Sequence, residues 1–335
     1  MSYEIHSSKI ANINLTKVIY ELTSIESDQK IVLYDKKLET YYASLLEQIS
    51  SVPGCILMAL PEGEAVKSFQ NYELYMEKLI EKRVHRGSHL VAFGGGATSD
   101  FVGFLAATCL RGLDWSVIPT TLLAMIDAAV GGKVAINSKF GKNLVGAFHK
   151  PEIIWICDKF LKTLDQEHFD SGLGELVKYG LLSGEINENI LSKKDLSPII
   201  ELSSRFKEVL TTEDFRENSK RKILNLGHTI GHALEKKYGV PHGKAVLEGL
   251  VIEHNIFVPE SSVPSLLFEL IEALGLKLSP SIKKEDIPEL VDLCFRDKKM
   301  VSTSTLEFVV ATNVENVESR LVTEHELTSL LNDYL

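Results

Sequence analysis

The sequence predicts an α/β protein in which a doubly wound N-terminal domain precedes a mainly α-helical domain. Short apolar runs alternate with amphipathic stretches in the first half, as in a sheet whose strands are joined by helices. Long helical patterns with few β-branched runs dominate the second half. The chain has 335 residues, enough for two domains. We place them at residues 1–160 and 161–335, because the pattern changes near residue 160.

The candidate strands of the first half follow one another in a regular order. Each is a short apolar run, at residues 30–34, 55–59, 89–93, 115–118 and 153–157. Residues 38–49 and 71–83 lie between them and carry apolar side chains at helical spacing. One β-branched run, at residues 305–311, interrupts the helical second half.

Composition and charge exclude several classes of partner. The formal net charge is −10 and the pI is near 5.6. Nucleic acid or an anionic membrane would need a broad basic surface, so neither is an expected partner. The four cysteines form no CxxC pair, which indicates reduced thiols. The sequence shows no secretory signal and no apolar run long enough to span a bilayer, so we expect a cytoplasmic protein.

A glycine turn, Gly94-Gly-Gly-Ala-Thr-Ser-Asp100, follows the candidate strand 89–93 and opens an apolar helix. Glycines let the backbone approach a pyrophosphate closely, and free N–H groups at the helix start favour its negative charge. A dinucleotide-binding turn is therefore one interpretation. A tight strand-to-helix turn capped by Ser99 or Asp100 is an equally good one.

Polar and glycine residues repeatedly interrupt the apolar segments of residues 111–143. Examples are Gly131-Gly-Lys133 and Gly141-Lys-Asn143. Such interruptions cost packing, and a ligand cleft would account for them. A run of turns with solvated lysines is the alternative.

Glu175 and Lys178 lie three residues apart, on one face of a predicted helix with apolar neighbours. Viewed alone, this spacing is typical of a surface ion pair. A functional role needs support from elsewhere in the chain.

The strongest single signal is Asn225-Leu-Gly-His228-Thr-Ile-Gly-His232-Ala-Leu-Glu235, which His242 follows. His228 and His232 share a helical face because they lie four residues apart. Two or three imidazoles with one carboxylate form a common catalytic zinc site that leaves a coordination position open. Histidines that only complete a core are the alternative.

Taken together, these motifs resemble the 3-dehydroquinate synthase family and its relatives, the sugar-phosphate cyclases. The resemblance spans most of the chain, and ordered matches of this density are far more specific than any one motif. The matching segments are Pro61-Glu-Gly-Glu64-Ala-Val-Lys67, the glycine turn, Arg111-Gly, Pro119-Thr-Thr-Leu-Leu, Val130-Gly-Gly-Lys133, Gly141-Lys-Asn143, Leu161-Lys-Thr-Leu, Gly172-Leu-Gly-Glu175-Leu-Val-Lys178-Tyr-Gly, Leu224-Asn-Leu-Gly-His228-Thr-Ile-Gly-His232, His242-Gly and Arg296-Asp-Lys-Lys299.

The resemblance implies a Rossmann-like NAD-binding domain and a helical domain that holds a divalent metal, zinc or cobalt. The implied metal ligands are Glu175, His228 and His242, so that His232 would face the substrate. The implied NAD contacts are Asp35, Glu64, Lys67, Gly95, Gly96, Asp100, Thr120, Thr121, Lys142, Thr163 and Leu164.

The resemblance also implies a set of residues around a sugar-phosphate substrate. Those with catalytic roles would be Asp127, Lys133, Lys178, Arg221, Asn225 and His232; those that bind the substrate would be Arg111, Lys142, Asn143, Lys207, Lys298 and Lys299. Arg111 resembles an arginine that approaches the phosphate from a partner subunit, which implies a homodimer.

The implied substrate is 3-deoxy-D-arabino-heptulosonate 7-phosphate, converted to 3-dehydroquinate and inorganic phosphate in the shikimate pathway of aromatic amino acid biosynthesis. Phosphate elimination from an unactivated sugar is slow, because the neighbouring C–H bond is scarcely acidic. Transient oxidation by NAD would remove that obstacle, and the metal would polarise the alcohol. The implied enzyme is a carbon–oxygen lyase that acts on phosphates and recycles its NAD.

Several positions depart from the family pattern. Lys244 stands beside an implied metal ligand where the family usually carries glutamate, and it could turn outward to pair with Glu248. The other departures are Ala128, Ala129, Phe215 and Ser219. These changes leave room for a cyclase of sedoheptulose 7-phosphate or an aminated sugar, for a metal-dependent polyol dehydrogenase, and for a binding protein without catalytic activity.

Overall fold

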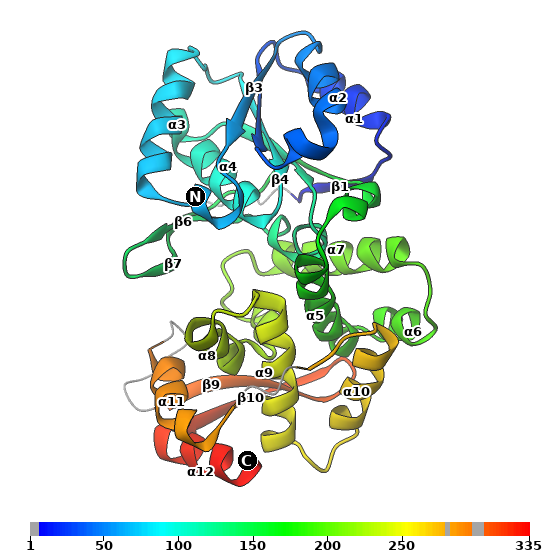
Figure 1. The fold of residues 1–335 in the computed structure, drawn as a ribbon, viewed down its shortest axis with the longest axis vertical. Helices are drawn as coiled ribbons and strands as arrows, with labels where there is room; N and C mark the ends of the chain where they lie inside the picture. The colour runs from blue at the N-terminus through cyan, green and yellow to red at the C-terminus, as the bar shows by residue number, and fades with distance from the viewer. Residues whose placement is uncertain (1–6, 279–281, 297–304) are drawn as a thin grey trace. The chain divides into compact units, whose positions relative to one another are not determined.

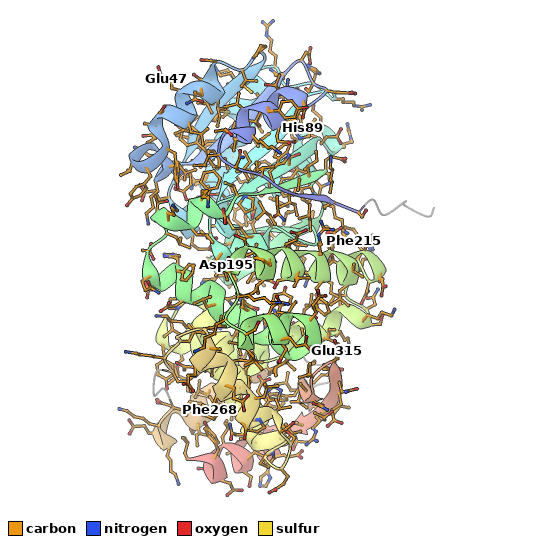
Figure 2. All side chains as sticks on the ribbon, turned by 90° about the vertical axis from the view of Figure 1, so that its right-hand side faces the viewer. Glu47, His89, Asp195, Phe215, Phe268 and Glu315 are labelled. Carbon is orange, nitrogen blue, oxygen red and sulfur yellow. The ribbon has the colours of Figure 1, made fainter. Side chains whose placement is uncertain are left out.

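The computed structural model describes residues 7–278, 282–296 and 305–335, which form two compact units (Figure 1). The sheet unit comprises Met1–Asp165 and Ser204–Arg216, and the helical unit comprises Gln166–Ser203 and Glu217–Leu335. A short segment that follows the first helices of the helical unit thus belongs to the sheet unit. Figure 2 labels side chains of both units: Glu47, His89 and Phe215 belong to the sheet unit, and Phe268 and Glu315 to the helical unit.

The sheet unit is built on a six-stranded parallel sheet with the order β1-β8-β5-β4-β2-β3. Its strands are β1 (Lys9–Asn12), β2 (Lys30–Asp35), β3 (Cys55–Leu60), β4 (His89–Gly94), β5 (Asp114–Pro119) and β8 (Ile153–Ile156). β4 is buried along its whole length, as expected for a central strand with helices on both faces. Sequence patterning predicted these strands except β1, which has only two apolar residues.

Helices and one β-ribbon complete the sheet unit. They are α1 (Lys17–Ser24), α2 (Leu38–Ser50), α3 (Phe69–Glu81), α4 (Gly96–Thr108) and the antiparallel pair β6 (Lys133–Ser138) and β7 (Gly141–Phe148). α4 is apolar all round and packs its Phe101, Val102 and Leu105 in the core. The ribbon occupies the stretch whose interrupted pattern indicated either a ligand cleft or a run of turns.

The helical unit contains several helices and one β-hairpin. The helices are α5 (Gln166–Leu182), α6 (Gly184–Leu191), α8 (His228–Tyr238), α9 (His242–Phe257), α10 (Val263–Ala273), α11 (Ile287–Phe295) and α12 (Glu324–Tyr334); the hairpin is β9 (Thr305–Asn313) and β10 (Asn316–Thr323). Ile230, Leu234, Phe308 and Leu327 belong to one apolar core that joins these elements. Helix α7 (Leu196–Glu213) is divided between the two units.

The predicted fold class is confirmed: a doubly wound parallel sheet is followed by a mainly helical unit. All four cysteines are free thiols, and three of them are buried. In the described ranges, no helix combines the length and apolar character needed to cross a membrane.

Candidate active site

The sheet unit brings predicted cofactor residues to the carboxyl ends of neighbouring strands. After the edge strand β3, the chain returns to place β4 on the other side of β2, so the strand order reverses between β2 and β4. Open α/β sheets bind ligands outside the carboxyl ends of strands at such a switch point. Asp35 ends β2 and Gly95 directly follows β4, so both lie beside the reversal.

The glycine turn after β4 packs directly against the end of β5. The backbone N–H of Thr120 donates to the carbonyl of Gly94 at 2.9 Å. A Cβ added at Gly95 would lie 3.0 Å from Cγ2 of Thr121, so a larger residue would crowd the turn. Because α4 begins at Gly96, its free N–H groups are directed towards this turn and suit an anionic group.

The buried Lys67 is the centre of a polar network in the same unit. Its Nζ lies 2.7 Å from Oδ2 of Asp100 and 3.6 Å from Oε1 of Glu64, and it donates a short hydrogen bond to Oδ1 of Asn143. Burial raises the pKa of the Asp100 carboxyl, and the ammonium of Lys67 opposes that rise. Asn137 extends the network, since its Nδ2 donates to Glu64 at 2.7 Å and its Oδ1 accepts from the backbone N–H of Asn143 at 2.9 Å.

Three of the predicted cofactor residues lie at the end of β2 or after β8. Oδ2 of Asp35 accepts from the backbone N–H of Gly63 at 3.1 Å, which ties the end of β2 to the turn before Glu64. Thr163, at the end of the 3₁₀ segment Asp158–Thr163, has its hydroxyl 3.0 Å from that of Tyr42, and Leu164 follows it.

Asp127 lies in a π-helical turn, Ala124–Ala128. Single π turns occur frequently at functional sites. Nζ of Lys207 lies 2.8 Å from both the backbone carbonyl and Oδ1 of Asp127. The part of α7 that belongs to the sheet unit therefore brings a buried cation to this carboxylate.

The remaining substrate residues predicted in the sheet unit are exposed. Lys133 begins β6 and Lys142 lies on β7. Arg111 adopts a φ of 71° and follows Leu110, which has a φ of 50°; both are rare conformations for residues with a side chain. Both side chains are exposed.

In the helical unit, Glu175 of α5 contacts two of the predicted metal ligands. Its Oε1 lies 3.3 Å from Nε2 of His242 and 3.6 Å from Nε2 of His228. Its Oε2 lies 2.5 Å from Nζ of Lys178. The exposed fractions of the Glu175 and Lys178 side chains are 0% and 1%, so the surface ion pair that their spacing suggested is instead a buried one.

Both of these histidines are oriented through their other ring nitrogen. Nδ1 of His228 lies 3.0 Å from the carbonyl of Leu226, and Nδ1 of His242 lies 2.9 Å from Oε2 of Glu235. An acceptor at Nδ1 holds a proton there, so that Nε2 is the nitrogen that can bind a metal once its own proton is released, as in metal-binding histidines. Burial lowers the pKa of His242, but hydrogen bonds to Glu175 and Glu235 outweigh it and raise the pKa to about 9.

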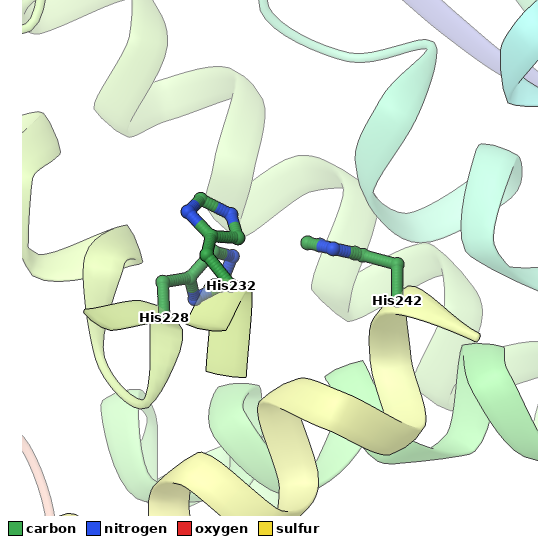
Figure 3. A group of neighbouring side chains, drawn as sticks. All are labelled: His228, His232 and His242. Carbon is green, nitrogen blue, oxygen red and sulfur yellow. The ribbon is translucent and has the colours of Figure 1, made fainter. Parts of the chain in front are cut away.

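His232 completes a cluster of three imidazoles. Figure 3 shows His228 and His232 on α8, with His242 directed towards them from the start of α9. One ring nitrogen of each histidine lies within 4.8 Å of those of the other two. The structure thus brings the four side chains Glu175, His228, His232 and His242 together.

The geometry of this cluster suits a divalent metal. Bonds of about 2.0–2.1 Å in tetrahedral geometry require ligand atoms to lie roughly 3.4 Å apart. The two separations between Glu175 Oε1 and the histidine Nε2 atoms, 3.3 and 3.6 Å, are close to that value. A carboxylate and neutral imidazoles are also the donors that zinc and cobalt prefer.

Two other predicted residues of the helical unit, Arg221 and Asn225, lie in the segment before α8. Arg221 is buried in the 3₁₀ turn Lys220–Asn225, and Nδ2 of Asn225 donates to Oε1 of Glu217 at 2.8 Å. Lys244 lies on α9, and its Nζ is 4.0 Å from Oδ2 of Asp170, which is the longest distance for an ion pair. Lys298 and Lys299 lie outside the described residues.

Sequence reasoning assigned no role to three residues that orient the predicted site: Asn137, Glu217 and Glu235. Glu235 lies at the end of the histidine motif, seven residues before His242. This closeness in sequence was the signal that could have indicated its contact with His242. Asn137 and Glu217 lie in stretches without periodicity, and only the folded chain brings them to Asn143 and Asn225.

Solved structures of other proteins have the same fold as this chain. A 2-deoxy-scyllo-inosose synthase solved with carbaglucose-6-phosphate, NAD+ and Co2+ superposes with a TM-score of 0.82 at 22% identity, over 97% of this chain and 96% of that one. A 2-epi-5-epi-valiolone synthase from Streptomyces hygroscopicus, with NAD+ and Zn2+ bound, gives 0.85 at 18% identity, over 99% and 98%. This chain therefore shares the fold of these two synthases.

Sequence comparison defines the family to which the chain belongs. The family model described as 3-dehydroquinate synthase N-terminal matches residues 57–171. The one described as 3-dehydroquinate synthase C-terminal matches residues 172–300. A 3-dehydroquinate synthase from Alkaliphilus metalliredigens is 36% identical over 328 residues, 92% of this chain and 91% of the relative. One from Staphylococcus aureus is 37% identical over 287 residues, 81% and 80%. The chain belongs to the 3-dehydroquinate synthase family.

Proposed function

We propose that this protein is a 3-dehydroquinate synthase, a carbon–oxygen lyase that converts 3-deoxy-D-arabino-heptulosonate 7-phosphate to 3-dehydroquinate and inorganic phosphate. The observation that carries the proposal is the convergence of Glu175, His228 and His242 in a chain that matches the family over both of its parts. A protein without catalytic activity would have no need for histidines oriented around the buried carboxylate of Glu175.

We assign the metal to Glu175, His228 and His242, with His232 left for the substrate. Glu175 would use Oε1, because Oε2 faces Lys178. Leu226 and Glu235 hold the two ligand histidines in the required tautomer. When bound, zinc or cobalt would act as a Lewis acid on the substrate alcohol.

We assign NAD to the switch-point edge of the sheet unit. The start of α4 at Gly95 and Gly96 would bind the pyrophosphate, and Asp35, Glu64, Lys67, Asp100, Thr120, Thr121, Lys142, Thr163 and Leu164 would complete the site. When bound, NAD would supply the transient oxidation that makes the C–H bond next to the leaving phosphate acidic.

Local cationic residues would allow a protein with a net negative charge to bind an anionic substrate. Lys133 and Arg221 would bind the phosphate through charge-assisted hydrogen bonds. Lys207 holds Asp127 in place, and Asn225 is oriented by Glu217. His232 would move protons, since an imidazole titrates near neutral pH.

We further propose a cytoplasmic homodimer. Leu110 and Arg111 are exposed and have strained backbone conformations, which supports a role for this turn at a subunit contact. From there Arg111 would reach the phosphate of the substrate bound in the other subunit. The free thiols of all four cysteines agree with a reducing compartment.

One assay tests the activity. The purified protein is incubated with the heptulosonate phosphate, a catalytic amount of NAD, and zinc or cobalt, and inorganic phosphate and NADH are both followed. A synthase releases phosphate in proportion to substrate without net NADH. A polyol dehydrogenase would accumulate NADH, and a cyclase of another sugar would release phosphate only from sedoheptulose 7-phosphate or an aminated sugar.

A further inference from the structure

We propose that Glu253 of α9 is a positioning residue for the metal centre, because it caps the helix that carries His228. This inference rests on the metal site proposed above. Glu253 is fully buried, eleven residues after His242 on the same helix. Its Oε2 accepts from the backbone N–H of Gly227 at 3.1 Å, and its Oε1 accepts from that of Ile230 at 2.8 Å.

Helix α8 needs such a cap because it cannot provide one itself. The first N–H groups of a helix have no partner within the helix, and the side chain of the N-cap residue usually supplies one. Here the N-cap is Gly227, which has no side chain. Ile230 is the third residue of α8, so its N–H is the one that a normal N-cap side chain would bind.

Close packing explains why the N-cap is glycine. Gly227 has a φ of 74°, which is rare for residues with a side chain. A Cβ there would lie 2.5 Å from Cγ of Leu250, and a Cβ at Gly249 would lie 2.1 Å from the carbonyl of Gly227. The backbones of α8 and α9 therefore touch at this point, and the capping carboxylate must come from α9.

The cap connects the two metal-binding histidines. His228 is the first residue of α8 and His242 is the first of α9. Glu253 accepts hydrogen bonds from Gly227 and Ile230, which lie before and after His228 in the sequence. It therefore fixes the first turn of α8 against the helix that bears His242. A carboxylate also interacts favourably with the positive end of the α8 dipole. The separation of the two imidazoles is then set before a metal binds.

The test measures metal affinity and ligand geometry apart from turnover. In Glu253→Gln, one oxygen and the negative charge are lost, and we expect zinc affinity, measured by competition with a chelator, to fall at least tenfold, as it does for residues that orient metal ligands. The visible absorption spectrum of the cobalt form should change, because it reports the arrangement of ligands. Glu253→Asp, which keeps the charge but shortens the reach, should lie between wild type and Glu253→Gln.

His254→Gln provides a matched control. His254 is the next residue on α9, is equally buried, and makes two hydrogen bonds, to the carbonyl of Leu250 and from the backbone N–H of Ala311 on β9. It should lose stability but keep the zinc affinity and the cobalt spectrum of the wild type. Equal metal affinity in Glu253→Gln and wild type would overturn the proposal.

Amide hydrogen exchange of the metal-free wild type tests the same idea without a variant. The amides of Gly227 and Ile230 should exchange as slowly as those in the middle of α8, because the cap exists before metal binds. Rapid exchange there would refute the proposal even if the Glu253 variants failed to fold. Absence of metal binding by the wild type would instead refute the proposed function, so the two failures are distinguishable.

Discussion

Nδ1 of His242 lies 2.9 Å from a carboxylate oxygen of Glu235, which makes an imidazole–carboxylate pair beside Glu175. The carboxylate fixes the ring and raises its basicity, so its loss should weaken metal binding. We expect Glu235→Ala to lower zinc affinity at least tenfold, measured by chelator competition. Glu235→Gln should have a smaller effect, because its amide oxygen still accepts from Nδ1–H. Equal affinities in all three proteins would contradict the proposed orientation.

His232 and His242 should differ in what their removal abolishes. His242→Ala removes one of the proposed ligands, so we expect the purified protein to contain little metal. His232→Ala should retain bound metal but lose at least a hundredfold in kcat, within the usual contribution of about 10²–10⁴ from acid–base catalysis. Metal analysis and steady-state kinetics measure the two effects. Loss of metal from His232→Ala would show that this histidine, too, is a ligand.

Lys67 should stabilise the sheet unit and its cofactor site together. Lys67→Met leaves the partly buried Asp100 beside Glu64 without its cation. Breaking a fully buried pair costs about 3–5 kcal/mol, which is the upper bound here. We expect a lower free energy of unfolding and an NAD dissociation constant raised at least tenfold. Lys37→Met is the control, since Lys37 pairs with Asp165 at 3.2 Å on the surface and should contribute less than about 1 kcal/mol. Similar results for both variants would contradict the role of Lys67.

Two buried histidines should make the metal-free protein sensitive to acid. Burial lowers the pKa of His89 and that of His254 from 6.5 to about 4. As the pH falls below 6.5, the unfolded chain takes up protons that the folded chain does not. The stability that the neutral rings confer is thus present above pH 6.5 and is lost as the pH falls towards 4, at most about 3 kcal/mol for each ring.

Urea unfolding at a series of pH values, with a chelator present, measures this dependence. His89→Gln and His254→Gln should each flatten the curve between pH 6.5 and 4, because a glutamine takes up no proton. An unchanged slope in both variants would rule out these two rings as its source.

Lys133 and Arg221 should matter for substrate binding and turnover. We expect Lys133→Ala and Arg221→Ala each to cost about 2 kcal/mol or more in kcat/KM, through lost charge-assisted contacts to phosphate. Neighbouring cations serve as controls: Lys139→Ala on the same ribbon, and Lys222→Ala, whose partner is Glu307 at 2.9 Å. Near-normal kinetics in both Lys133→Ala and Arg221→Ala would remove these residues from the phosphate site.

Much of the fold could be predicted because periodicity and glycine turns are local properties. The strands β2, β3, β4, β5 and β8 are short apolar runs, and the glycine turn marked the start of α4. The ribbon of β6 and β7 was not predicted, because its exposed polar residues and glycines resemble a series of turns. The 204–216 segment was assigned to the helical domain by sequence position, whereas its contacts group it with the sheet unit.

The chain by itself determined which chemical groups are present and in which order: the glycine turn, the histidines four residues apart, and the family motifs around them. Only the tertiary structure decided that Glu175 meets His228 and His242 and that Lys207 pairs with Asp127. It also decided that Glu235 of α8 contacts the ring of His242 and that Glu253 of α9 accepts hydrogen bonds from the start of α8. Spacing along one helix follows from its pitch, but contacts between segments far apart depend on how helices pack. That packing rests on glycines such as Gly249, whose role becomes evident only when two backbones touch.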